Sequence, residues 1–446
     1  MIRCLTMENY RSVREQTVRF HPYTVVVGPN AAGKSNLLSA LVFLNHLVTY
    51  GLDSAVLYQR GWASIVNRRI WKMRDPAAAP PPTRLAVELE PPVRLYLPGD
   101  LPPGGIFPEA ETVRYEVAVH FADTGLGPDG VPWTPERVVE RVTLAGLRHL
   151  PTVSDPSASV LIVQETQFGL PSQGVREVRI TIREGQEWLP DAQRQVIEAM
   201  PPREHHPEFS PYAWLIGRLS WLVPDLFTAI RGIMLFDLQP LWMHGASQPV
   251  PYPQLNPYGG NLPQRLDQIF QAAADRDEFE ALLRMITPWV DHVRIFRQPD
   301  HSFLLAGLER FDRQADNVQM ESYTLSDGTL YTMALIAALH FEDVPVKLLE
   351  EPERYLHPAV FPIVAEWFAD VTDSRHKLLL TTHSPDLIAA LPVDHWDHIV
   401  YTYRTTEGDT CFQAVDPARL SESVLWGQLQ DPRVLQRLDL WYQGSH

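Results

Sequence analysis

Hydrophobic and polar positions alternate along the first 27 residues in the manner of β-strands. The alternation predicts two short strands and then a buried one, at Ile2 to Glu8, Thr17 to Phe20 and Tyr23 to Val27. An apolar run over residues 37–44 follows in helical style, and residues 51–75 read as an irregular lid. The chain is therefore expected to begin with three strands and a helix.

A longer β-like region lies between residues 84 and 184, where turn-rich stretches separate the apolar runs. The predicted strands are Arg84 to Glu90, Val113 to Phe121, Val138 to Leu144, Val160 to Gln164 and Val178 to Ile182. We expect these runs to form an antiparallel β subdomain.

The period becomes helical from about residue 187 to 290, with proline breaks, and this stretch predicts a compact helical insertion. Strands return from about residue 292 and then alternate with helices. The expected order is a helix over Leu330 to Phe341, a strand over Val346 to Leu349, a helix near Phe361 to Ala369, and strands over Leu378 to Thr382 and Ile399 to Tyr403. Such alternation implies a parallel sheet, so the predicted class is α/β.

Three parts follow from these changes of period. Residues 1–185 would form an N-terminal lobe with the β subdomain, residues 186–290 the helical insertion, and residues 291–446 a C-terminal lobe.

Composition narrows the class of protein. The chain has 446 residues, of which 45% are hydrophobic and 21% charged, and this is too apolar for a disordered chain. Its formal net charge of -16 argues against a surface coated in nucleic acid but permits a local basic groove. Cys4 and Cys411 match no metal-binding spacing, and neither a signal peptide nor 18 uninterrupted apolar residues occur. We expect a cytoplasmic protein without a membrane span.

The segment from Gly28 to Ser35, GPNAAGKS, fits the phosphate-loop pattern G-x-x-x-x-G-K-S and lies between the buried strand and the helix. The glycines let backbone N–H groups close around phosphates at the positive end of the helix dipole. Lys34 should neutralise the β- and γ-phosphates of ATP, and the Ser35 hydroxyl should bind Mg²⁺. Asn30, Gly33 and Asn36 belong to the same predicted nucleotide site.

Two later segments supply the remaining chemistry. The strand over residues 346–349 runs into Glu350 and Glu351, and we assign Glu350 to the metal and Glu351 to the attacking water. His383 ends the next buried strand, where it could hydrogen-bond the γ-phosphate or that water. Both positions should lie at one edge of the parallel sheet.

The LSDGT segment, residues 325–329, precedes a predicted helix. Ser326 and Gly328 could offer a hydroxyl and backbone N–H groups to a phosphate at the helix N-terminus. The alternative is an ordinary helix start in which the serine is the N-cap. The residues alone leave both interpretations open.

These four motifs, in this order, resemble the head domain of the ATP-binding-cassette (ABC) superfamily in its chromosome-maintenance and RecF-like branch. GPNAAGKSN resembles the Walker A motif, LSDGT the signature, LLEEPE the Walker B motif and TTHSPD the switch histidine. MENYRSV, GGNLPQRL, EEPERYLHP and TTHSPDLI further resemble AAA-family ATPases related to the overcoming-lysogenization-defect (OLD) nucleases and to phage-defence ATPases. The resemblance covers roughly residues 1–50 and 230–405.

The resemblance implies an ABC-type head that dimerises head to tail through ATP, or assembles into a higher even oligomer. Ser326 and Gly328 of one subunit would then meet the γ-phosphate bound by the other. It also implies that Arg11 and Ser12 lie near the nucleotide phosphates and that His357 makes a subunit contact. Glu350 stands where aspartate is commoner, which leaves the rate of hydrolysis open.

Two details of the family pattern stay open at the level of sequence. The glutamine of the Q-loop could be Gln59 or Gln164. The run from Arg68 to Arg74, RRIWKMR, could hold a nucleic-acid backbone or form a solvated lid edge.

A nuclease domain of the TOPRIM type follows the switch histidine in OLD nucleases, but only about 60 residues follow His383 here. A histidine metal cluster is not convincing either, since Glu204, His205 and His206 lie between prolines and suggest a surface turn. The leading hypothesis is a Mg-ATP-dependent ATPase whose dimer senses or regulates for a separate effector, a nuclease or toxin, in bacterial anti-phage defence. The alternatives are a RecF-like ATPase that clamps duplex DNA and a slow-turnover ATP-binding scaffold.

Overall fold

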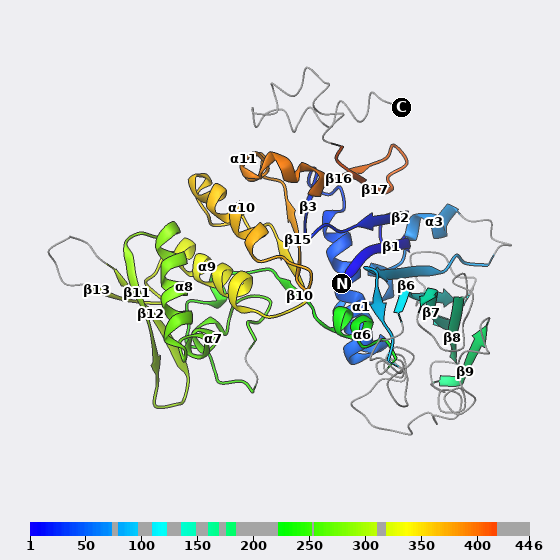
Figure 1. The fold of residues 1–446 in the computed structure, drawn as a ribbon, viewed down its shortest axis with the longest axis horizontal. Coiled ribbons are helices and arrows are strands. Elements are labelled where there is room, and N and C mark those ends of the chain that lie inside the picture. The colour runs from blue at the N-terminus through cyan, green and yellow to red at the C-terminus, as the bar shows by residue number, and fades with distance from the viewer. Residues whose placement is uncertain are drawn as a thin grey trace, which may run out of the picture. The chain divides into compact units, whose positions relative to one another are not determined.

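The computed structural model describes residues 1–73, 79–96, 109–122, 135–148, 159–168, 175–183, 222–251, 254–309 and 318–416. The chain divides into two compact units that each combine several stretches of sequence (Figure 1). The first unit contains residues 1–21, 31–233 and 402–413, and the second contains residues 22–30, 234–401 and 414–446. The chain passes between the units inside the predicted phosphate loop.

An antiparallel sheet of eight strands dominates the first unit, in the order β2-β1-β4-β6-β7-β8-β9 with β5 paired to β6 (Figure 1). The strands are β1 (Ile2–Tyr10), β2 (Val13–Arg19), β4 (Thr83–Leu89), β5 (Val93–Arg94), β6 (Glu109–Phe121), β7 (Pro135–Arg148), β8 (Ser159–Phe168) and β9 (Val175–Arg183). The antiparallel β subdomain predicted from the alternating pattern is confirmed.

Alternating burial along β1, β4 and β6 shows why this region forms strands with one face in the core. On the partly exposed face, charged side chains pair across neighbouring strands. Arg84 contacts Glu8 at 2.8 Å and Arg114 contacts Glu88 at 2.8 Å. Exposed pairs of this kind stabilise a fold only slightly, so buried apolar residues hold the sheet together.

The described part of the first unit contains the helical segments α1 (Lys34–Tyr50), α2 (Leu52–Tyr58), η1 (Trp62–Ser64), α3 (Arg68–Met73) and α6 (Pro224–Arg231). Asn45 of α1 donates hydrogen bonds to the carbonyls of Ile230 and Arg231 at the end of α6, at 3.1 and 2.9 Å. The predicted irregular lid over residues 51–75 was wrong as far as it is described, through residue 73. Gly51 and Gly61 have positive φ and precede α2 and η1, respectively. Each helix of this stretch is too short for its sequence to show a clear helical period of hydrophobic residues.

The second unit is built on a largely parallel sheet in the order β10-β14-β15-β3-β16-β17. The strands are β10 (Ile233–Phe236), β14 (Val346–Glu350), β15 (Lys377–Thr382), β3 (Tyr23–Val27), β16 (Ile399–Arg404) and β17 (Thr410–Ala414). The chain passes from the first unit to the second within β10 and again within β17, and from the second to the first within β16. Strands β14, β15, β3 and β16 run parallel. The four buried residues at the start of β14 and all of β15 explain the continuous apolar runs in the sequence. The α/β class and the parallel sheet are confirmed.

A second, antiparallel sheet in this unit contains β11 (Val290–Arg297), β12 (Phe303–Glu309) and β13 (Val318–Glu321). The helices are α7 (Leu262–Ile269), α8 (Ala273–Ile286), α9 (Asp327–Ile336), the π-helix η4 (Ala337–Phe341), α10 (Phe361–Asp370) and α11 (Pro385–Ala390). Short 3₁₀ segments are η3 (Pro240–Trp242), η5 (Pro358–Val360) and η6 (Val393–His398). Sequence analysis missed β10, a short strand inside a stretch expected to be helical.

The compact helical insertion stays a prediction, because residues 184–221 lie outside the described residues, as do Glu204, His205 and His206. The division into parts 1–185, 186–290 and 291–446 likewise stays a prediction. Among the described residues, no helix is both long and apolar enough to cross a membrane.

Candidate functional site

The phosphate loop connects the buried strand β3, which ends at Val27, to helix α1, which begins at Lys34. Gly33 has a φ of +108°, a conformation that other residues rarely adopt. A Cβ atom at Gly33 would overlap the Thr410 hydroxyl and lie 2.8 Å from the Asn36 side-chain nitrogen. The second glycine of the motif is therefore required by both backbone geometry and space.

The N-terminus of α1 has no side-chain cap. The same is true of α2, α6, α7, α8 and α10, whereas the Ser326 hydroxyl accepts from the Thr329 N–H at the start of α9 and the Ser384 hydroxyl accepts from the Leu387 N–H at the start of α11. Helix N-terminal N–H groups without a side-chain cap, together with the helix dipole, suit an anionic ligand. Lys34 is buried at this end of the helix and Ser35 is exposed.

Ser12 and Asn36, two of the predicted site residues, are brought together in the first unit. The Asn36 amide donates to the Ser12 hydroxyl at 2.7 Å, and that hydroxyl is 2.7 Å from the hydroxyl of Thr410. Thr410 donates in turn to the carbonyl of Ala32 in the phosphate loop at 2.8 Å. Sequence analysis missed Thr410, because it belongs to no motif and reaches the loop only through the pairing of distant segments.

Arg11 lies on the turn between β1 and β2 with a φ of +52°. Its guanidinium donates to the side-chain oxygen of Gln59 at 2.6 Å, and the same oxygen accepts from Ser39 of α1 at 2.9 Å. Gln164 is instead buried in β8, where it donates to Glu140 at 3.3 Å. Of the two Q-loop candidates, Gln59 is the one that contacts the helix of the phosphate loop.

A basic pocket of about 440 Å³ opens in the first unit beside these residues. The uncharged polar residues of its lining include Ser12, Asn36 and Asn67. Its charged lining consists of four arginines and one aspartate: Arg11, Arg68, Arg69, Arg404 and Asp409. Arg404 also donates to the carbonyl of Ala31 in the phosphate loop at 3.0 Å. Arg11 was predicted to lie near the nucleotide phosphates, and Arg68 and Arg69 were predicted to hold nucleic acid or to form a solvated lid edge. No role was predicted for Arg404, which lies near the far end of the chain. Arg74 lies outside the described residues.

The second unit places the predicted carboxylates and the histidine at one edge of its sheet. Glu350 is the last residue of β14 and pairs with Thr381 of β15, while Thr382 pairs with Val27 of β3. Because parallel strands end at the same edge, Glu350, His383 and the first residues of the phosphate loop share that edge. The strand register therefore brings together segments that are more than 300 residues apart.

Glu351 and His383 contact each other directly, with 3.1 Å between His383 Nδ1 and Glu351 Oε1. The Glu351 backbone has a φ of +48°, and its N–H donates to the Thr381 carbonyl at 2.9 Å. A non-glycine residue in this conformation is strained, and such strain concentrates at functional sites. The other Glu351 oxygen accepts from Arg354 Nε at 2.8 Å.

Glu353 is a site residue to which sequence analysis assigned no role. Its Oε1 accepts from the Thr382 hydroxyl at 2.5 Å and from the His383 backbone N–H at 3.4 Å. Its Oε2 is buried without a hydrogen-bond partner, and burial raises the pKa of this carboxyl above its ordinary value. Glu353 therefore ties the end of β14 to the end of β15, and only its tertiary contacts reveal it.

The LSDGT segment forms the start of α9, where Ser326 is the N-cap that the alternative interpretation expected. A Cβ atom at Gly328 would lie 2.9 Å from the Tyr355 carbonyl, so this glycine permits close packing against the segment after Glu351. His244 holds the segment from its other side, with its two ring nitrogens 2.9 Å from the Ser322 carbonyl and 2.8 Å from Asp327 Oδ1. The predicted contact of Ser326 and Gly328 with a phosphate stays a prediction.

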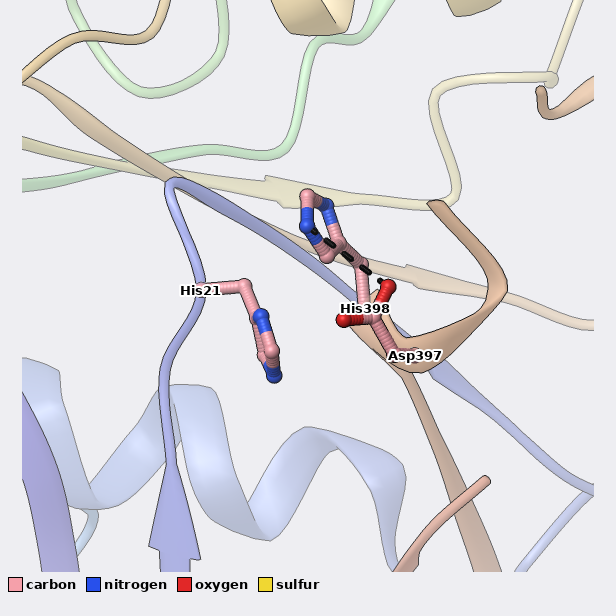
Figure 2. Close-up of side chains that lie close together, drawn as sticks. All are labelled: His21, Asp397 and His398. Carbon is pink, nitrogen blue, oxygen red and sulfur yellow. Dashed lines mark ion pairs between the residues drawn. The ribbon is translucent and has the colours of Figure 1, made fainter. Parts of the chain in front are cut away.

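Figure 2 shows Asp397 and His398 at the end of η6, where His398 Nε2 is 3.9 Å from Asp397 Oδ1. The ring of His398 stacks on that of His395 with 4.9 Å between centroids, and His395 Nδ1 is 2.7 Å from the Tyr23 hydroxyl. His21, which the figure also labels, belongs to the first unit. We assign no metal to these side chains.

His357 caps η5, where its ring nitrogen accepts from the Ala359 N–H at 3.1 Å. The predicted subunit contact of His357 stays a prediction.

Two segments of the chain match models of known protein families. Residues 243–389 match a family described as an AAA domain and proposed AbiEii toxin of a type IV toxin–antitoxin system. Residues 1–69 match a family described as an AAA ATPase domain. No curated protein matches the chain.

Solved heads of SMC proteins are similar to the chain over most of its length, at low identity. The SMC head domain from Thermotoga maritima is 9% identical, with a TM-score of 0.36, and covers 93% of this chain and 99% of its own. The Smc head with an extended coiled coil bound to the C-terminal domain of ScpA, from Pyrococcus furiosus, is 11% identical, with a TM-score of 0.40 and coverages of 96% and 99%. The Smc head with a coiled coil and joint from Pyrococcus yayanosii is 11% identical, with a TM-score of 0.43 and the same coverages. By sequence, two segments of this chain are similar to AAA-family ATPase domains. One segment contains the phosphate loop, and the other contains LSDGT, the carboxylates and His383.

Proposed function

We propose that this protein is a Mg-ATP-dependent ATPase of the ABC type. The observation that carries the proposal is the sheet edge where the phosphate loop begins and where Glu350, Glu351 and His383 also lie. A phosphoryl-transfer site needs a phosphate cradle, a metal-side acid and a group that orients water. The two segments that supply these groups are also the ones similar to AAA ATPase domains.

The residues present fit ATP and Mg²⁺. The α1 N-terminus without a side-chain cap, the positive φ of Gly33 and the side chain of Lys34 suit the phosphates. The Ser35 hydroxyl and the Glu350 carboxylate are hard oxygen ligands of the kind Mg²⁺ prefers. When bound, Mg²⁺ would neutralise charge on the phosphate oxygens.

The protein side chains have distinct roles in this proposal. Glu351 orients the attacking water, and His383, held against Glu351, hydrogen-bonds the γ-phosphate or that water. The basic pocket next to α1, with four arginines, attracts the anionic nucleotide. In this proposal Arg68 and Arg69 attract the nucleotide, and the basic run does not bind nucleic acid.

Beyond the catalytic step, we infer that two heads sandwich ATP and that the dimer regulates a separate nuclease or toxin in bacterial anti-phage defence, in the cytoplasm. The family match that names a type IV toxin–antitoxin system supports a role in a system of two components, although the name gives the toxin as the matching domain itself. A RecF-like clamp on duplex DNA is the rival. The net charge of -16 weighs against it.

The proposal is tested with Glu351→Gln and Lys34→Ala proteins. We expect Glu351→Gln to bind ATP but to hydrolyse it about 100-fold more slowly, and Lys34→Ala to lose ATP binding. Native mass spectrometry of Glu351→Gln, with and without Mg-ATP and duplex DNA, then measures assembly. An ATP-dependent dimer that is indifferent to DNA supports the regulatory role, whereas a dimer that retains DNA only with ATP supports the clamp. Normal hydrolysis by Glu351→Gln would refute the role assigned to this carboxylate.

A further inference from the structure

Arg354 bridges two carboxylates of the second unit and has no role in the proposal above. Its Nε donates to Glu351 Oε2 at 2.8 Å, and its Nη1 donates to Asp237 Oδ1 at 3.2 Å. The Arg354 side chain is 38% exposed and that of Glu351 18%, so the first contact is partly shielded from water. Burial alone would lower the pKa of Arg354, but the charges of Glu351 and Asp237 raise it above its ordinary value. The guanidinium therefore keeps its positive charge between the two carboxylates.

Asp237 is held independently of Glu351. It follows strand β10, which neighbours β14 in the parallel sheet, and its backbone N–H donates to the Pro257 carbonyl at 2.8 Å. Its Oδ1 also accepts from the Gln239 amide at 2.8 Å. The guanidinium is therefore attached at one end to the edge of the sheet and at the other to the predicted water-positioning carboxylate.

The two oxygens of Glu351 have different partners. Oε1 lies 3.1 Å from His383 Nδ1 and Oε2 accepts from Arg354. The Glu351 backbone is itself fixed by its hydrogen bond to Thr381, and the Arg354 N–H donates back to the Glu351 carbonyl at 3.1 Å. With Oε2 anchored, the carboxylate plane is fixed and Oε1 is directed to His383. Without Arg354, the carboxylate could rotate about its side-chain bonds.

We propose that Arg354 is a positioning residue for Glu351, anchored by Asp237, and that it acts on the hydrolysis step and not on nucleotide binding. This inference rests on the proposed ATPase function. A planar guanidinium can hold two carboxylates through different nitrogens, whereas a lysine ammonium is a point charge on a flexible stem. Lysine should therefore not replace Arg354.

The test compares steady-state ATP hydrolysis by wild type, Arg354→Gln, Arg354→Lys and the control Arg297→Gln. Arg297 of β11 makes a 2.7 Å ion pair with Asp267 of α7 in the same unit, and neither element carries a predicted site residue. We expect both Arg354 variants to lose about tenfold or more in kcat with KM for ATP nearly unchanged, and the control to keep wild-type kcat. Wild-type kcat in Arg354→Gln, or a loss confined to KM, would overturn the proposal.

A second comparison separates positioning from general damage. Single-turnover hydrolysis of radiolabelled ATP is measured for Glu351→Gln and for Glu351→Gln combined with Arg354→Gln. If Arg354 acts through Glu351, the second substitution lowers the residual rate no further. An equal fold-loss in both backgrounds would overturn the proposal, because it would mean that Arg354 supports the fold or the nucleotide directly.

Asp237→Asn serves if Arg354→Gln does not fold. Asparagine keeps the shape of the anchor but removes its charge, so kcat of Asp237→Asn should fall by about threefold. Adding Asp237→Asn to Arg354→Lys should lower kcat no further than Arg354→Lys alone. Unchanged kcat in Asp237→Asn would contradict the anchoring role. If the wild type itself does not hydrolyse ATP, the proposed function fails and the inference with it. If the wild type turns over, Glu351→Gln does not, and Arg354→Gln is normal, only the inference fails.

Discussion

Non-glycine residues with positive φ concentrate around the candidate site. Arg11, Ala31, Glu351 and Tyr355 have φ values between +48° and +63° and lie in or next to the motifs that sequence analysis singled out. This conformation is uncommon outside glycine, and it persists only where surrounding contacts enforce it. At Glu351 the enforcing contacts are the hydrogen bond to Thr381 and the two side-chain partners. Strain at these four residues falls on the motifs, whereas Arg60 and His301 share the conformation outside them.

Gly33 allows a sharp test at this scale, because Gly61 is a matched control. Both have positive φ, +108° and +97°, so alanine at either position should cost roughly 1–2 kcal/mol of stability. Only at Gly33 would the new Cβ also meet Thr410 and Asn36, whereas the space around Gly61 is open. We expect Gly33→Ala to weaken ATP binding by about tenfold or more and Gly61→Ala to leave it intact. Thermal unfolding and binding of a fluorescent ATP analogue measure the two effects. Equal loss of affinity in both variants would contradict this account of the loop.

Strand β14, which ends at Glu350, also contacts the π-helix η4 that continues α9. Lys347 of β14 is 4% exposed, and its ammonium donates to the Leu339 carbonyl inside η4. Arg265 of α7 contacts Glu342 just after η4, with 2.5 Å between Nε and Oε1. π-Helical turns have i→i+5 bonds and are often found where function requires an irregular helix. The end of α9 is therefore fixed by side chains from two other elements.

Lys347 should make stability rise with pH. Burial lowers the pKa of Lys347 from 10.5 to about 8, an effect that Glu342, Asp343 and Asp373 only partly offset. Between these two values the unfolded chain binds the proton and the folded chain does not, so the free energy of unfolding increases with pH, by up to about 3 kcal/mol. Lys347→Met removes this contribution. Urea unfolding of both proteins from pH 7 to 10.5 measures it, and the wild type should gain stability relative to the variant. Parallel curves would show that Lys347 does not change its proton occupancy on folding.

Elements with a strong period were predicted well and short ones were not. Strand β3 was predicted with its observed bounds, since a strand buried in a parallel sheet is a continuous apolar run. Helices α2 and α3 were missed, because six or seven residues show no period. The predicted position of Glu350 and His383 at one edge of the sheet is observed, while the roles assigned to them stay predictions. Glu353, Arg354 and Asp237 were not assigned roles, because their roles depend on tertiary contacts and not on local spacing.

At the scale of the whole molecule, the proposed function uses two groups of segments. The phosphate loop and α1 would bind the phosphates, and the LSDGT segment and the carboxylate strand β14 would supply the groups for assembly and hydrolysis. The described residues place Lys34 in the first unit and Ser326 in the second. Ser326 caps α9, and its proposed second task, to meet a phosphate bound by another copy of the chain, requires assembly. In a head-to-tail dimer with two-fold symmetry each composite site takes the phosphate loop from one chain and LSDGT from the other.

Mixing two inactive variants tests this arrangement. Lys34→Ala should abolish phosphate binding, and Ser326→Arg should block the LSDGT side, so each protein alone should hydrolyse almost no ATP. In a mixed dimer both substitutions fall in one composite site and the other site is intact. Because half of the dimers in an equal mixture are mixed, activity should recover to about a quarter of the wild-type value per chain. Ser326→Ala, which loses the helix cap without adding bulk, controls for the roughly 1 kcal/mol cost of the cap. Continued inactivity of the mixture, with both variants folded, would mean that one chain completes its own site or that hydrolysis requires both sites at once.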